Sequence, residues 1–183
     1  MKTLTFEEFV KNNPEEIDSE GRTRLMRAMK EAFISQELLE GLVKAEKDIN
    51  SKDKNGLTAS MHAVKYSVSG RVLDYLFEHG ADIDATDNQK YTTLHHDAES
   101  SCFNERTLLI LLKHKANPLA VNKQGLIPLQ LAQKHVLAFY KDPIRKLEEA
   151  TQAAQDKRAK VMTHQMGWYK SLPRDKYLVN EKS

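Results

Sequence analysis

The chain has 183 residues, of which 28 are Lys or Arg and 26 are Asp or Glu, so its formal net charge is only +2. A charge this small excludes a global electrostatic drive toward nucleic acid or an anionic membrane, although a local patch can still be hidden in the balance. Apolar residues make up 40% of the chain and charged residues 30%, and 7 Gly and 5 Pro are too few for a loop-rich or barrel architecture. The length fits one elongated domain or two small ones.

The cysteine content and the N-terminal sequence indicate the cellular compartment of the chain. Cys102 is the single cysteine and cannot form an internal disulfide, which favours a reducing compartment. The N-terminus turns acidic within a few residues and has no apolar stretch typical of a secretory signal. The longest apolar runs, such as residues 108–112, are far too short for a membrane span. We therefore expect a cytoplasmic protein at the point of synthesis.

The first predicted element is a short helix near the N-terminus. Thr5 is followed by Glu8 three residues later, which is the pattern of a capping box. Phe6, Phe9 and Val10 then supply one apolar face. We expect this helix to cover the exposed end of the structure that follows.

A four-residue pattern, here called the turn frame, then recurs along the chain. It begins with Asp or Asn, ends in Gly or Lys, and occupies residues 18–21, 53–56, 87–90 and 122–125, at intervals of 35, 34 and 35 residues. A short segment with helical periodicity follows each frame, and in the first three units a second helical stripe follows, over residues 38–43, 72–77 and 108–112. Such self-similarity predicts a stack of helix–turn–helix repeats.

The best-preserved stretch identifies the kind of repeat. Residues 76–85 read Leu-Phe-Glu-His-Gly-Ala-Asp-Ile-Asp-Ala and are followed by Thr92-Thr93-Leu94-His95. This pattern resembles ankyrin repeats over roughly residues 17–140, and the resemblance implies an all-α solenoid of about four helix–turn–helix repeats. The chain departs from the family pattern at several places, of which Asp97, at a position of small packing residues, is the most unusual.

The resemblance and the composition together suggest two regions. Residues 1–140 form the repeat domain with its N-terminal cap, with repeats near 18–52, 53–86, 87–121 and 122–142, and residues 143–183 form a C-terminal capping helix and tail. Asp142 and Pro143 are a suitable N-cap and first-turn pair for that helix. Its weak apolar stripe runs to about His164, so we expect its first half to pack on the last repeat and its second half to project into solvent.

One cluster, His95-His96-Asp97, could suggest a metal site. Neighbouring residues on a helix point about 100° apart, so the two imidazoles cannot easily share one ion. The resemblance instead implies that His95 makes hydrogen bonds between neighbouring repeats. Zinc-ligand spacings, glycine-rich phosphate loops and nucleophile elbows are absent, and Cys102 has no sign of a partner base. We predict no catalytic residue, no cofactor and no metal, hence no enzyme.

The resemblance implies that the protein functions through a binding surface. In ankyrin proteins the turn tips and the first helices of successive repeats line a concave face that binds partner proteins. Carried over by position, the candidate contact residues are Arg22, Arg24, Lys54, Asn55, Leu57, Lys65, Tyr66, Gln89, Lys90, Tyr91, Glu99, Lys123, Gln124, Leu126 and Lys134. An exposed Tyr91 beside Lys90 would suit an acidic protein surface. The alternative is a merely solvated face, with Tyr66 packed between helices.

The C-terminal tail is a second candidate surface. Residues 141–183 hold 10 basic and 6 acidic side chains, so this segment carries +4 and the rest of the chain −2. It also contains Trp168 and Tyr169, which we add to the candidate contacts. Three interpretations stay open: the aromatic pair folds back onto the last repeat, which we favour, or it docks a partner protein, or it binds nucleic acid.

We therefore expect a non-catalytic module that binds another protein through the concave face, and a monomer rather than an oligomer. The chain resembles small stand-alone bacterial ankyrin proteins, which suggests two sharper alternatives: an effector delivered into a host cell, or an immunity protein that neutralises a toxin. Binding of nucleic acid or an anionic surface through the basic tail is the weaker alternative.

Overall fold

The computed structural model describes residues 4–31, 33–100, 105–134 and 141–171, with only the backbone described at residues 134, 141, 142 and 163–171. Cys102 therefore lies outside the described residues. Within them the chain forms nine α-helices and no strand. In chain order these are α1 (Phe6–Asn12), α2 (Arg24–Ala28), α3 (Gln36–Ala45), α4 (Ala59–Lys65), α5 (Gly70–Glu78), α6 (Thr93–Glu99), α7 (Glu105–Lys113), α8 (Pro128–Lys134) and α9 (Lys141–Ser171).

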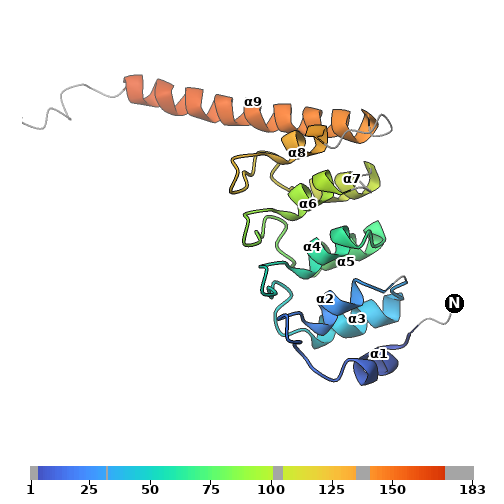
Figure 1. Ribbon diagram of the computed structural model, residues 1–183. Helices are drawn as coiled ribbons and strands as arrows, with labels where there is room; N and C mark the ends of the chain where they lie inside the picture. Colours follow the sequence, from blue (N-terminus) through green and yellow to red (C-terminus); the bar gives the residue numbers. More distant parts are fainter. Residues whose placement is uncertain (1–3, 32, 101–104, 135–140, 172–183) are drawn as a thin grey trace, which may run out of the picture.

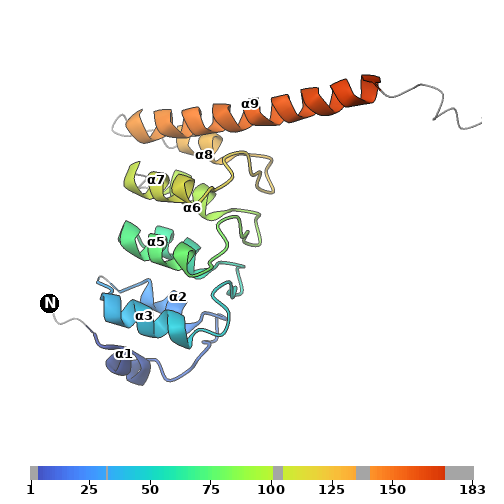
Figure 2. The ribbon, with the colours of Figure 1, turned by 180° about the vertical axis from the view of Figure 1, so that it is seen from behind.

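The helices stack as a column of antiparallel pairs (Figure 1). The first helices of the repeats form one layer, in which α2 packs on α4, α4 on α6 and α6 on α8. The second helices form the other layer, in which α5 packs on α7. Helix α9 contacts both α7 and α8, so it occupies the place of a second helix in the last repeat. The expected all-α solenoid is therefore present, with loops projecting along one edge of the column (Figure 2).

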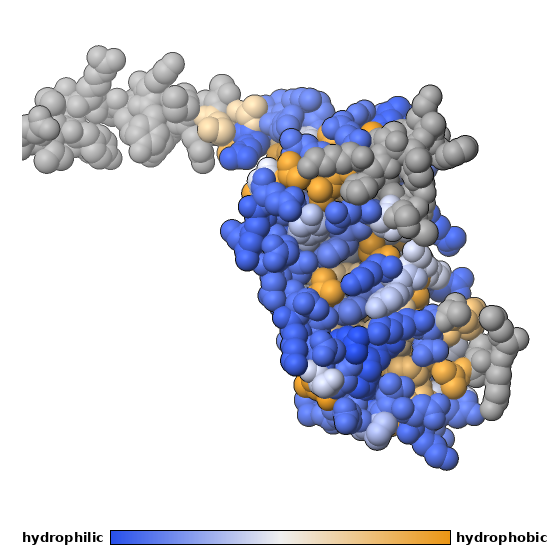
Figure 3. Space-filling view, in the orientation of Figure 1, coloured by the Kyte–Doolittle hydropathy of each residue, from blue (hydrophilic) through white to orange (hydrophobic). Residues whose placement is uncertain are grey.

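The core runs the length of the column because each repeat contributes equivalent leucines. Leu38, Leu73 and Leu108 stand 35 residues apart on successive second helices, and each is at most 1% exposed. Leu147 of α9 is fully buried as well and continues the same layer. Burial of one leucine side chain is worth roughly 1.5–3 kcal/mol. The outer surface in the view of Figure 3 is mostly hydrophilic, with apolar residues in small separate patches.

The N-terminal helix forms as expected. The Thr5 hydroxyl accepts a hydrogen bond from the Glu8 N–H, and the Glu8 carboxylate accepts one from the Thr5 N–H, both at 3.2 Å. Phe9 is 1% exposed, and the Phe6 ring lies so close to Gly41 of α3 that a Cβ there would approach it to 2.7 Å. Helix α1 therefore closes the first repeat, and Gly41 is the residue that makes room for it.

The C-terminal helix differs from the prediction at both ends. It begins at Lys141, so Asp142 lies in its first turn and not at its N-cap. It continues to Ser171, well past His164, and therefore includes Trp168 and Tyr169. Because the helix is continuous, the chain does not turn back toward the repeats at this point, and the favoured interpretation of a folded-back aromatic pair is wrong. Figure 1 shows α9 extending far beyond the column.

Asp97 is a core position whose chemistry opposes the fold. It lies in α6, is 2% exposed, and its Oδ2 has no hydrogen-bond partner among the described residues. It borders a small cavity whose other lining residues are Val64, Ser67, Val68, Leu73, Ser100 and Thr107. Burial raises the pKa of this carboxyl well above its ordinary value of 3.8.

We predict that Asp97→Ala stabilises the protein at neutral pH. An unpartnered buried polar group costs about 1–3 kcal/mol, and the substitution removes it. Because the folded-state pKa is raised, the destabilisation develops as pH rises from about 4 through that pKa, so the advantage of the variant shrinks at acidic pH. Thermal unfolding of both proteins across pH measures this, with the exposed Glu37→Ala as control. A variant that is less stable than the parent at neutral pH would contradict the account.

Candidate functional site

The hairpin tips are built by the first residue of each turn frame. The side-chain Oδ1 of Asp18, Asp53, Asp87 and Asn122 accepts hydrogen bonds from the backbone N–H groups two and four residues later, all at 2.8–3.0 Å. Asp and Asn are the residues whose short side chains reach these groups. The spacing of the turn frames along the sequence is therefore the spacing of one hydrogen-bonded backbone turn, which occurs four times.

The last residue of each frame has a left-handed backbone. The φ angles are +78° at Gly21, +81° at Gly56, +60° at Lys90 and +74° at Gly125. Glycine adopts this region without a steric penalty, which explains three of the four. At Gly56 a Cβ would also approach the backbone nitrogen of Asn88 to 2.7 Å. The third frame therefore holds a lysine in a conformation that L-residues adopt uncommonly.

Neighbouring tips are joined by backbone hydrogen bonds. The N–H of Lys54 donates to the carbonyl of Glu20 at 2.9 Å, and Asn88 donates in the same way to Asn55 at 3.0 Å. Lys123 donates to Gln89 at 2.9 Å. These three bonds, here called the tip ladder, hold the tips in a row whose exposed side chains include Lys54, Lys90 and Lys123.

Behind the tips, two histidines occupy equivalent positions in consecutive repeats. His62 Nε2 lies 2.9 Å from Asp53 Oδ2, and His96 Nε2 lies 3.0 Å from Asp87 Oδ2. Burial lowers the pKa of both histidines, so each ring is neutral at pH 7 and its Nε2–H donates to the carboxylate. The same aspartate therefore closes the turn with Oδ1 and holds a first-helix histidine with Oδ2.

His95 links the third and fourth repeats, as the resemblance implied. Its Nδ1 accepts from the Thr92 N–H at 3.2 Å, and its Nε2 donates to the Leu126 carbonyl at 3.1 Å. The side chain is fully buried, and burial lowers its pKa. His95 and His96 are thus directed to separate partners.

Two tyrosines rest on these histidines. The Tyr66 ring is 40% exposed and stacks on His62 with 6.0 Å between ring centroids. The ammonium of Lys30 lies 5.7 Å from the centre of the Tyr66 ring, within the range of a cation–π interaction. Tyr91 is only half-buried and lies against both His95 and His96, at 5.4 and 5.3 Å. Both rings are therefore held in place, each with one side available.

A hollow opens between the tips and α6. It is lined by Asp87, Gln89, Tyr91, His96, Glu99, Lys123 and Gln124, and so spans the third and fourth repeats. Lys65 and Glu99 are exposed at equivalent positions on consecutive first helices, and both act electrostatically on His96. The tips, the hollow and the exposed side of the first helices together form what we call the concave face.

The structure separates the predicted contact residues into accessible and inaccessible ones. Those exposed on the tips or first helices are Lys54, Asn55, Lys65, Tyr66, Gln89, Lys90, Glu99, Lys123 and Gln124. Leu57 is only 6% exposed and packs with Met61 and Ala85, so its prediction as a contact is wrong. Leu126 is half-buried against the core, and Arg22 is held by Asp18 at 2.9 Å. The side chain of Lys134 lies outside the described residues.

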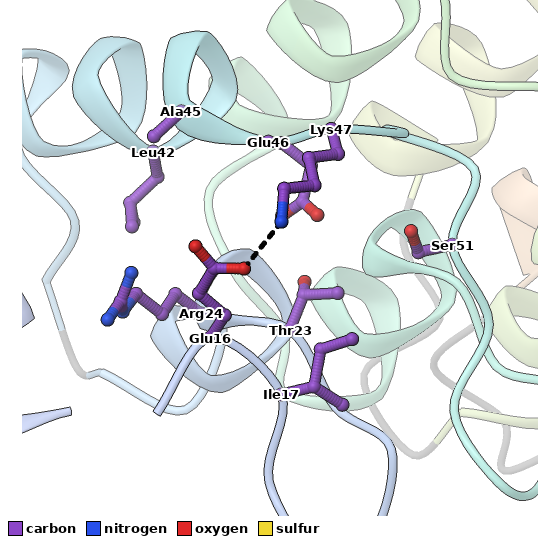
Figure 4. A pocket seen from close by; sticks show the side chains of 9 residues that line it. All are labelled: Glu16, Ile17, Thr23, Arg24, Leu42, Ala45, Glu46, Lys47 and Ser51. Atoms are coloured by element: carbon purple, nitrogen blue, oxygen red, sulfur yellow. Dashed lines mark hydrogen bonds and ion pairs between the residues drawn. The ribbon is translucent and has the colours of Figure 1, made fainter. Parts of the chain in front are cut away.

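Arg24 points elsewhere. Its guanidinium donates to the backbone carbonyls of Asn13 and Pro14, in the segment between α1 and α2. Figure 4 shows it in a pocket at this junction, beside an ion pair of 2.8 Å between Lys47 and Glu16. Arg24 therefore fastens the N-terminal segment and is not a contact on the concave face.

Sequence reasoning missed three residues of the concave face: Lys30, His62 and His96. A signal for each was available in the spacing. His62 and His96 both stand nine residues after the aspartate of their own turn frame, and Lys30 stands 35 residues before Lys65. These polar positions follow the same period as the apolar residues and the turns.

The described residues contain no group of three or more His, Cys, Asp or Glu side chains arranged to hold a metal ion. The helices described also include none that is both long and apolar enough to cross a bilayer. Trp168 and Tyr169 belong to α9 and not to the concave face, and their side chains lie outside the description.

We predict that the histidines make the fold sensitive to mild acid. Because burial lowers the folded-state pKa of His62, His95 and His96 below the ordinary 6.5, stability is full above that value and is lost as pH falls below it. His95→Gln should reduce this dependence between about pH 7.5 and pH 5.5, and should cost about 1–3 kcal/mol at the higher pH. Urea unfolding at both values measures it, with the exposed His79→Gln as control. An equal dependence of stability on pH in His95→Gln and in the parent would refute the role of His95 in this acid sensitivity.

Comparison with known families agrees with this geometry. A family model of three ankyrin repeats matches residues 25–122, which is more than half of the chain. Proteins with such repeats generally mediate protein–protein interactions and are typically not enzymes. The match spans both histidine–aspartate pairs and, apart from Arg24, the three helix pairs α2–α3, α4–α5 and α6–α7. The chain belongs to the ankyrin-repeat family.

Proposed function

We propose that this protein is a non-catalytic adaptor that binds an acidic surface of a partner protein through its concave face. The observation that carries the proposal is the hollow between the tips and α6, which Tyr91 lines while its ring lies against His95 and His96. A tyrosine whose ring is already held loses little conformational freedom on binding, and such residues dominate protein interfaces.

The charge of the concave face supports an acidic partner. Its exposed cations are Lys30, Lys54, Lys65, Lys90 and Lys123, whereas its exposed acids are Glu20 and Glu99. The carboxylates of Asp53 and Asp87 are turned inward to the tip N–H groups and the histidines, so they are not placed to contact a ligand directly. The charged groups within direct reach of a partner on this face are therefore mostly cations. Complementary charge raises the association rate and selects the partner.

The rigidity of the face favours binding without rearrangement. The tips are fixed to one another by the tip ladder, and both tyrosines rest on buried histidines that are hydrogen-bonded in turn. A partner therefore does not have to order these groups, which reduces the entropic cost of association.

The test is quantitative binding of the captured partner. The full chain is used to capture proteins from the cells in which it occurs, and the partner is then identified by mass spectrometry and purified. We expect Tyr91→Ala and Lys90→Glu each to weaken its binding about tenfold or more in calorimetry.

Lys115→Glu is the matched control for the charge reversal. Lys115 is also an exposed lysine in a left-handed conformation, with φ +66° against +60° at Lys90, but it follows α7 in the layer of second helices. Its reversal should leave affinity within about twofold, since a charge distant from the interface is screened. A partner bound equally by all variants would show that the concave face is not the binding surface.

A further inference from the structure

The second half of α9 projects from the column without any described contact to it. The first half packs on α7 and α8: Leu147 is fully buried, Thr151 is 4% exposed, and Ala154 is half-buried. Every side chain described from Gln155 to Met162 is exposed. The helix nevertheless continues to Ser171, an overhang of about 25 Å at 1.5 Å per residue. Figures 1 and 2 both show it passing beyond the row of hairpin tips.

The overhang continues the same stripe with which α9 packs on the repeats. The packed positions Leu147, Thr151 and Ala154 are followed by Arg158 and Val161 at alternating steps of four and three residues. At 100° per residue, Arg158 lies about 20° and Val161 about 40° from the direction of Leu147. The alternation of four and three is the seam pattern of helices that pack side by side. The seam therefore continues along α9 beyond the part of the helix that packs on the repeats.

The chemistry of the continued seam is apolar with one central cation. Val161 and Met162 are 51% and 56% exposed, and they flank Arg158 on the two sides of the seam. Asp156 lies nine residues after Leu147, on the opposite side of the helix, where it accepts a hydrogen bond from Gln152 at 2.9 Å. Among residues 155–162 the seam therefore presents a positive charge between two apolar side chains, with no acid beside it.

From this geometry we propose that the α9 overhang is a docking site for an acidic amphipathic helix of a partner protein. Apolar residues of that helix would cover Val161 and Met162, and a carboxylate would pair with Arg158. Arginine suits this role because its guanidinium can bond a carboxylate at two points while its stem packs on apolar neighbours.

Charge argues against a second copy of this chain as the occupant. The described part of the overhang holds Lys157, Arg158 and Lys160 against Asp156 alone, a net charge of +2. Two copies packed along this seam would bring their Arg158 side chains into one positively charged interface, and like charges across a helical interface are destabilising. The residues of this site belong to α9 and not to the concave face, so variants at Arg158 and at Lys90 distinguish failure of this proposal from failure of the proposed adaptor function.

The test is a selection from displayed random peptides, each long enough for five helical turns, with the full chain as bait. Enriched peptides should be rich in Asp and Glu and should become helical on binding, measured by circular dichroism. Arg158→Glu and Val161→Asp should each lower the affinity for these peptides about tenfold or more. Changing the matching acidic residue of the peptide to Lys should restore binding to Arg158→Glu.

Lys160→Glu is the matched control. It makes the same change of charge on the same helix, but Lys160 lies about 140° from the direction of Leu147. The affinity of the Lys160→Glu variant for the enriched peptides should stay within about twofold of that of the parent. Enriched peptides that are not acidic, or that bind Arg158→Glu and the parent equally, would overturn the proposal. Peptides sensitive to Lys90→Glu but not to Arg158→Glu would place binding on the concave face alone. Self-association in sedimentation, abolished by Val161→Asp, would assign the overhang to a second copy.

Discussion

The hydrogen bonds from tip N–H groups to the first residue of each turn frame are the constraint on which the rest of the structure depends. Oδ1 of Asp18, Asp53, Asp87 and Asn122 fixes the direction in which the chain re-enters each first helix. Only when every tip has the same shape can the carbonyl of one tip meet the N–H of the next, as the tip ladder requires. The spacing of the helix layers, and with it the packing of the leucine core, follows from that match.

The same residues connect the scaffold to the surface that binds. Asp53 and Asp87 use their remaining oxygen on His62 and His96, and those histidines support Tyr66 and Tyr91. The side chains of the concave face are therefore positioned by the hydrogen-bonded turns themselves and not by a separate set of loops. Asn122 has an amide nitrogen in place of the second oxygen, and that nitrogen is buried without a hydrogen-bond partner among the described residues. The series of acid–histidine pairs ends there, at the repeat that α9 completes.

Local patterns were sufficient to predict the repeats and the capping box at Thr5, because each depends on residues close in sequence or on the period itself, whereas the role of His95 followed from the resemblance to ankyrin repeats. They failed where the outcome depends on contacts between distant segments. Leu57 and Arg24 occupy positions that are exposed in a generic repeat, but Leu57 is buried against Ala85, and Arg24 is drawn to the carbonyls of Asn13 and Pro14. The length of α9 was underestimated because its polar second half gives little apolar signal, whereas hydrogen bonds along the helix, such as that from Gln152 to Asp156, accompany its continuation.

The tip ladder has a polarity, since each tip accepts a hydrogen bond from the tip that follows it in the chain. A stack joined in this way gains or loses hairpin tips in whole units, although the length of a unit differs by one residue from frame to frame. An insertion of one complete repeat between two turn frames would meet an acceptor on one side and a donor on the other, whereas a single added residue within a frame would misalign every tip beyond it. The length of the binding surface is therefore quantised in steps of 34 or 35 residues, and duplication of a unit is the natural route by which such a chain could enlarge it.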